Sequence, residues 1–151
     1  MLRQSLNDAL KTAMLGKDSR GVSTIRLILA ALKDRDIAAR SRGVADGIGE
    51  DEILQMLQSM IKQRRESIAL YEKGNRPDLV DQEAEEIVII EKFLPAQMDE
   101  AAIQAAVESA VTEVGATGLK DMGKVIGLLK EKYNGRMDFA KASAQVKAKL
   151  A

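Results

Sequence analysis

The organisation of this chain is decided by one stretch, residues 87–95, which reads IVIIEKFLP. Its apolar residues continue a helical stripe that begins near Leu79, with the three- and four-residue spacing of an amphipathic helix. Pro95 ends the helix, because a proline disfavours helical backbone in the residue before it. The sequence therefore predicts one helical unit over residues 1–95 and a second over residues 96–151.

Upstream of this stretch, three more segments carry apolar residues at helical spacing. We expect a first helix over about residues 2–14, and residues 16–19 supply its end and an N-cap for the second. The second helix runs into the charged stretch 33–42, the third extends from about Glu50 to Gly74, and the fourth runs from Pro77 to Leu94. The N-terminal unit is thus predicted to contain four helices.

Downstream of Pro95 the same pattern predicts three shorter helices. Asp99 can cap the first of them, a glycine-containing helix follows and ends at Gly135, and Asp138 can cap the last. No stretch shows the sustained alternation of apolar and polar residues that is typical of a β-strand. The predicted fold class is therefore all-α, with a four-helix unit followed by a small three-helix unit.

The composition limits the chemistry that the chain can perform. Apolar residues make up 46% of the 151 residues, aromatic residues make up 3%, and cysteine, histidine and tryptophan are absent. Disulfides, thiol chemistry and every histidine-dependent triad are thereby excluded. We predict no catalytic residues, no metal site and no cofactor. The carboxylates of the fourth helix are expected to lie on its solvated outer face: Glu83, Glu85, Glu86 and Glu91.

The net charge is zero, but the charges are unevenly distributed. Residues 1–76 carry 14 basic and 10 acidic side chains, residues 77–116 carry 1 and 10, and residues 117–151 carry 8 and 3. An acidic middle repels a phosphate backbone, so any RNA contact is expected at the two basic ends. No run of residues has the length of a membrane span or a signal-peptide core, which makes the cytoplasm the expected location.

Two glycines lie four residues apart within the glycine-containing helix, in the stretch LKDMGKVIG at residues 119–127. Each glycine costs a helix interior about 1 kcal/mol relative to alanine. Gly123 and Gly127 share one face, and Lys120 and Lys124 flank it. Such a bare strip suits either close packing of a neighbouring helix or close approach of an anionic ligand, and the residues alone leave both alternatives open.

Other basic residues are candidates for the same RNA contact. Lys130 and Arg136 belong to the basic C-terminal unit, and Lys62 and Arg65 lie opposite the apolar stripe of the third helix. Arg64 and Arg65 could grip phosphates. The alternative for this helix is a solvated face with an ion pair between Lys62 and Glu66.

Several short motifs together resemble the YqeY family of GatB/YqeY-domain proteins. They are KQR at residues 62–64 with Glu66 and Ser67, Tyr71, Gly74 with Arg76, Asp78 and Leu79, Glu83 with Glu86 and Ile87, FLP at 93–95 with Gln97, and DMGKV at 121–125 with Gly127. The resemblance covers essentially the whole chain. In one departure, Met137-Asp138-Phe139 stands where the family often has Ala-Asp-Gly, and Phe139 is expected to pack into the core.

The resemblance implies an all-helical protein whose C-terminal unit is similar to the tail domain of the B subunit of glutamine-dependent tRNA amidotransferases, a tRNA-contacting element. The label of carbon–nitrogen ligase with glutamine as amide donor, often given to such proteins, is inherited from that larger subunit. This chain lacks the domain that performs the chemistry, so we do not expect an enzyme.

Two functions from different classes therefore compete. The first is a tRNA-binding accessory protein that uses Lys120, Gly123, Lys124, Gly127 and neighbouring cations. The second is a protein–protein adaptor that docks on an aminoacyl-tRNA synthetase or an amidotransferase subunit.

Overall fold

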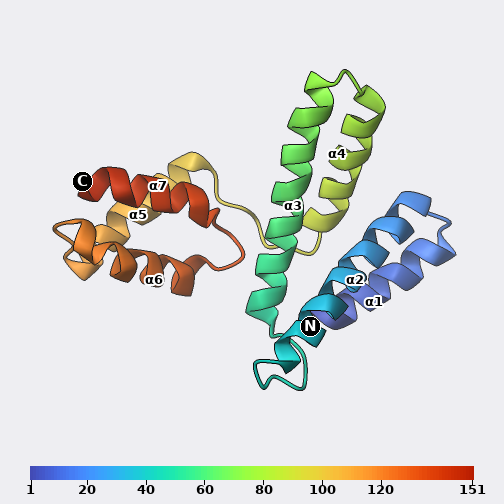
Figure 1. Ribbon diagram of the computed structural model, residues 1–151, viewed down its shortest axis with the longest axis horizontal. Coiled ribbons are helices and arrows are strands. Elements are labelled where there is room, and N and C mark those ends of the chain that lie inside the picture. Colours follow the sequence, from blue (N-terminus) through green and yellow to red (C-terminus); the bar gives the residue numbers. More distant parts are fainter. The chain divides into compact units, whose positions relative to one another are not determined.

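A computed structural model describes residues 1–151 and contains seven α-helices, one 3₁₀ turn and no strand (Figure 1). The all-α prediction is confirmed. No helix is both long enough and apolar enough to cross a membrane. In chain order the elements are α1 (Leu2–Leu15), α2 (Ser19–Arg40), α3 (Glu50–Lys73), α4 (Pro77–Glu91), α5 (Glu100–Val114), η1 (Leu119–Asp121), α6 (Met122–Tyr133) and α7 (Phe139–Leu150).

The packing contacts divide the chain into two units, Met1–Pro95 and Ala96–Ala151. In the first unit, α1 pairs with α2 and α3 pairs with α4, and α2 also packs on α4 (Figure 1). In the second unit, α5, α6 and α7 each contact the other two. Each unit has a separate cluster of buried aliphatic side chains, as the scarcity of aromatic residues requires.

Three helices begin at the aspartates that the local sequence favours. The side chains of Asp18, Asp99 and Asp138 each accept a hydrogen bond from a backbone N–H two or three residues later, at 3.0, 2.8 and 3.0 Å. These bonds satisfy donors that a helix start otherwise leaves free. The predicted caps at Asp99 and Asp138 are confirmed, and Asp18 is the cap within the predicted segment 16–19.

The fourth helix ends earlier than predicted. Regular α-helix stops at Glu91 rather than Leu94, and the next three N–H groups bond carbonyls three residues back, in a tighter turn. Leu94 precedes Pro95, and its backbone is therefore kept out of the α region.

One expectation about the acidic residues of α4 is wrong. Glu86 does not lie on the outer face but is buried, and its carboxylate accepts a hydrogen bond from Nε of Arg64 on α3 at 2.9 Å. Arg64 also donates to the backbone oxygen of Met60. The neighbouring Glu83 is half-buried, and this burial, together with the charge of Glu86, raises the pKa of Glu83. An ion pair thus joins α3 to α4 inside the larger unit.

A second polar cluster ties α1 to the end of α2 and to the loop that follows. Arg3 donates to both oxygens of Asp36 at 2.7 Å and to the backbone oxygen of Ile48 at 2.8 Å, and the N–H of Ile48 donates back to Asp36. Gly47 has a φ of +91°, and a Cβ there would lie 2.6 Å from the Arg3 guanidinium. A glycine is required at this position for both reasons.

Removing one partner of the buried ion pair should destabilise the first unit strongly. We expect Glu86→Ala to lower the free energy of unfolding by about 3–5 kcal/mol, because it leaves the Arg64 charge buried without its partner. The control is Arg65→Ala, whose exposed pair with Glu91 at 3.5 Å should contribute at most about 1 kcal/mol. Urea unfolding of both variants measures the difference, and equal effects would contradict the account.

The Arg3–Asp36 cluster should make stability depend on pH. The hydrogen bond from Arg3 lowers the pKa of Asp36 below its usual value. A carboxyl group whose pKa is lower in the folded state contributes stability that is present above its unfolded pKa, about 3.9, and is lost as the pH falls through the folded value. Asp36→Asn should therefore flatten the decline in melting temperature between neutral pH and acid. A variant that keeps the full decline would exclude this contribution.

Candidate nucleic-acid interface

The orientation of α6 follows from the residues that it buries. Val125 and Leu129 are completely buried between α5 and α7, and Met122 and Ile126 pack against the same cluster. Residues three, four and seven apart share a helix face, so burial of this apolar side turns the opposite side outward. The outward side carries Gly123 and Gly127, both exposed. The core of the second unit thus places the glycines on the surface.

The surroundings of the two glycines decide between the alternatives that the sequence leaves open. A Cβ built on Gly123 or on Gly127 would have no neighbouring atom within 4 Å. No helix of the second unit packs on the strip, so the packing explanation is wrong for contacts within this unit. Two glycines in one 12-residue helix are therefore unfavourable to its stability, with no compensating contact inside the second unit.

Lysines surround the bare strip on α6. Lys130 lies three residues after Gly127 and therefore on the same face, whereas Lys120 and Lys124 lie near the start of the helix. All three lysines are exposed and none takes part in an ion pair. Glu131 is also exposed on this side and offsets part of the charge. The strip remains a surface with an excess of free ammonium groups.

Other cations of the second unit are paired with the carboxylates of α5. Three ion pairs join α5 to α6 or α7, with N···O distances of 2.7, 3.9 and 3.9 Å: Lys132 with Glu113, Lys141 with Glu100, and Lys149 with Glu108. These three lysines therefore differ from those beside the glycines, which form no ion pair. The sequence shows only one basic cluster, and the structure is needed to tell paired from unpaired lysines.

Asp121 lies at the junction between η1 and α6 without capping the helix. Its carboxylate accepts a hydrogen bond from the backbone N–H of Thr117 at 3.0 Å, which fixes the loop that precedes the glycines. This bond, with smaller contributions from Lys120 and Lys124, lowers the pKa of Asp121. The carboxylate is thus engaged by the loop, and the start of α6 has no side-chain cap.

Arg136, a candidate for RNA contact, makes several contacts within the second unit that the sequence does not predict. Its guanidinium lies 6.0 Å from the centre of the Tyr133 ring, and its Nε lies 3.5 Å from the backbone oxygen of Ala96. Its carbonyl accepts a hydrogen bond from the N–H of Met98 at 2.8 Å. Gln97 adds a bond to the carbonyl of Gly135 at 2.6 Å. These contacts fasten the first residues of the unit to the α6–α7 loop.

The candidates in the first unit lie on α3 and differ from one another. Lys62 is exposed and takes part in no ion pair, whereas Arg65 pairs with Glu91 of α4 at 3.5 Å. Arg64 cannot grip a phosphate as predicted, because its side chain is 12% exposed and bound to Glu86. The apolar periodicity gave no signal for this pair, since both residues are charged. The structure gathers Lys120, Gly123, Lys124, Gly127 and Lys130 on one surface of the second unit, whereas Lys62 and Arg65 belong to the first unit.

Fold and surface together define a small all-helical protein with an exposed, basic, glycine-containing helix in its second unit. Residues 3–150 match the family described as Yqey-like protein. The match covers nearly the whole chain, and the chain belongs to this family. Phe139, at the departure from the family pattern, packs against the core of the second unit as expected.

The chain is similar to several fungal proteins named altered inheritance of mitochondria protein 41, mitochondrial. It is 31% identical to the one from Kluyveromyces lactis over 144 residues, which cover 95% of this chain and 73% of the relative. With the Lachancea thermotolerans protein it shares 35% identity over 73% of this chain and 58% of the relative. The matched segment spans about half of several other relatives, such as 46% of the Vanderwaltozyma polyspora protein. Their shared name specifies no activity, substrate or partner.

Replacing both strip glycines should stabilise the protein. Gly123→Ala with Gly127→Ala adds two methyl groups that meet no atom within 4 Å, and each change removes the helix penalty of glycine. We expect the free energy of unfolding of the second unit to rise by about 1 kcal/mol for Gly127→Ala and by less for Gly123→Ala, because Gly123 is only the second residue of α6. Thermal and urea unfolding measure this. A loss of stability would mean that the glycines serve packing after all.

Proposed function

We propose that this protein is a tRNA-binding accessory protein and that the outward face of α6 contacts the RNA backbone. The observation that carries the proposal is the pair of exposed glycines, with no atom near them, beside lysines that form no salt bridge. A helix surface without side chains lets a phosphate backbone come close, and free ammonium groups at its edges supply the attraction.

The residue types at this surface favour recognition of shape and backbone. Tyr133 is half-buried against the core, and the exposed part of the strip carries no aromatic ring on which a base could stack. Readout of single-stranded bases depends on such stacking. A folded RNA with closely spaced phosphates, such as the elbow or a stem of tRNA, therefore suits the surface better than a single strand.

The resemblance to the tail domain of the amidotransferase B subunit supports the same ligand. In that enzyme the chemistry resides outside the tail, and we propose that the ligase label of the family describes the relationship rather than an activity of this chain. We place the protein in the cytoplasm, where tRNA is abundant. The names of the fungal relatives carry the word mitochondrial, which also fits a compartment that contains tRNA.

Binding to total tRNA, compared with a length-matched RNA duplex across a salt series, tests the proposal. We expect preference for tRNA and a steep decrease of affinity with salt. Lys120→Glu with Lys124→Glu should weaken binding and make the logarithmic salt slope shallower by about 0.9 per lost phosphate contact. Gly123→Ala with Gly127→Ala should also weaken binding while the protein becomes more stable.

The matched control reverses two exposed lysines that lie far along the chain from α6. Lys11→Glu with Lys73→Glu makes the same change in net charge on α1 and α3. If both charge variants lose affinity equally, the attraction is general and α6 is not the site. Equal, weak binding of tRNA and duplex by the unmodified protein would contradict the proposed function itself.

A further inference from the structure

The outward face of α2, in the first unit, carries three cations that α6 and its proposed ligand do not involve. Arg26, Lys33 and Arg40 are all exposed and lie seven residues apart, hence on one side of the helix at intervals of roughly 10 Å. None of them takes part in an ion pair. The ion pairs that α2 makes with its neighbours use Arg20 and Asp36. The charge of Arg40 acts on Asp36, whose carboxylate is already bound by Arg3.

An apolar seam runs beside these cations. Leu27 and Ile37 are 48% and 49% exposed, and the small Ala30 lies between them. Their spacing of three and seven residues corresponds to the a and d positions of a heptad, and the three cations then occupy its g positions. Asp34 is the one acidic member of the seam. This arrangement is the one by which a helix receives a second helix.

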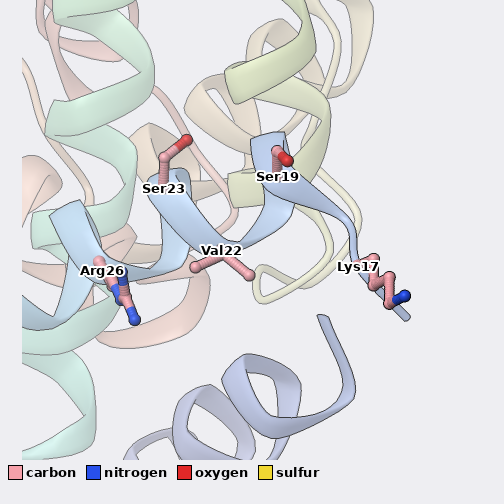
Figure 2. Close-up of a pocket in the computed structure, with 5 residues that line it drawn as sticks. All are labelled: Lys17, Ser19, Val22, Ser23 and Arg26. Atoms are coloured by element: carbon pink, nitrogen blue, oxygen red, sulfur yellow. The ribbon is translucent and has the colours of Figure 1, made fainter. Parts of the chain in front are cut away.

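A shallow hollow of about 330 Å³ adjoins the N-terminal end of the seam (Figure 2). It is formed by the turn before α2 and the first two turns of that helix, with an apolar side chain between two cations. Its lining residues are Lys17, Ser19, Val22, Ser23 and Arg26. Leu15, just before this turn, is 86% exposed. The hollow can accept a large apolar side chain of a docked helix, the kind of anchor that dominates binding energy.

We propose that the outward face of α2 is a docking surface for an acidic amphipathic helix of a partner protein. Glutamates or aspartates of the partner face Arg26, Lys33 and Arg40, and its leucine-like residues cover the seam and fill the hollow. Charge complementarity sets the partner and the orientation, and the apolar contacts hold it.

Two other occupants fit the surface less well. The acidic helix α4 of a second copy has most of its exposed carboxylates already bound within the chain: Asp78 by Arg76, Glu85 by Arg20 and Glu91 by Arg65. A nucleic acid would leave Leu27 and Ile37 without apolar contact and would bring phosphates beside Asp34. A protein helix satisfies both the charges and the seam.

A designed peptide tests the proposal on the full-length protein. The probe is a fluorescent three-heptad helix with leucine at a and d and glutamate at e and g, and the comparison probe has lysine at e and g. We expect the glutamate peptide to bind and the lysine peptide not to bind. Arg26→Glu, Lys33→Glu and Arg40→Glu together should weaken the glutamate peptide at least about tenfold, which corresponds to the loss of three exposed pairs.

The controls separate this surface from general charge and from the proposed RNA site. Lys11→Glu, Lys73→Glu and Lys92→Glu make the same charge change on exposed positions elsewhere in the first unit and should leave peptide binding intact. Leu27→Ser with Ile37→Ser should weaken it without unfolding the protein, since both side chains are half exposed. Circular dichroism checks the fold of each variant.

Four outcomes would overturn the proposal. The first two are equal binding of the two peptides and peptide binding that the α2 triple variant does not change. Another is concentration-dependent self-association, in sedimentation, that the triple variant abolishes, because the occupant would then be a second copy. The last is loss of tRNA binding in the triple variant together with no peptide binding, which would make this face an RNA surface. Peptide binding that persists in Lys120→Glu with Lys124→Glu keeps the two proposals independent.

Discussion

The burial of Val125 and Leu129 between α5 and α7 is the constraint on which the proposed RNA-binding surface depends. A 12-residue helix has too little intrinsic stability to persist alone, and packing of its apolar side supplies what propensity does not. The same packing determines which residues face outward. Gly123, Gly127 and Lys130 lie on one exposed surface because the opposite side of α6 is buried in the core. Lys132 does not contribute a free charge to this surface, because it forms an ion pair with Glu113 of α5.

The two exposed glycines are the main evidence that this surface of α6 serves a function other than stability. Alanine would make α6 more stable at both positions, since no atom of the second unit fills the space beside the glycines. Unfavourable residues that survive at an exposed site are expected where function requires them. The surface of α2 differs in kind, because its cations are interleaved with half-exposed Leu27 and Ile37. One chain thus presents a bare basic strip and a heptad-patterned basic face on separate units.

Sequence reasoning predicted the helices well because their signals are local. The caps at Asp99 and Asp138 and the proline at the start of α4 act within one turn, and apolar periodicity reports which side of a helix is buried. It failed for Arg64 and Glu86, since a buried pair of opposite charges has the same pattern as a solvated one. It also left the role of Gly123 and Gly127 open, because only three-dimensional packing shows whether another element covers a glycine. Which lysines of the second unit are paired likewise depends on contacts between helices.

The most direct test of the central claim is to follow backbone amide signals of ¹⁵N-labelled protein while tRNA is added. Glycine amides resonate apart from most others, so Gly123 and Gly127 can be observed individually. We expect the largest changes between Lys120 and Lys130, while the amides of α5 residues on the side opposite α6 change little. Changes confined to the first unit, or none in α6 at saturating tRNA, would contradict it.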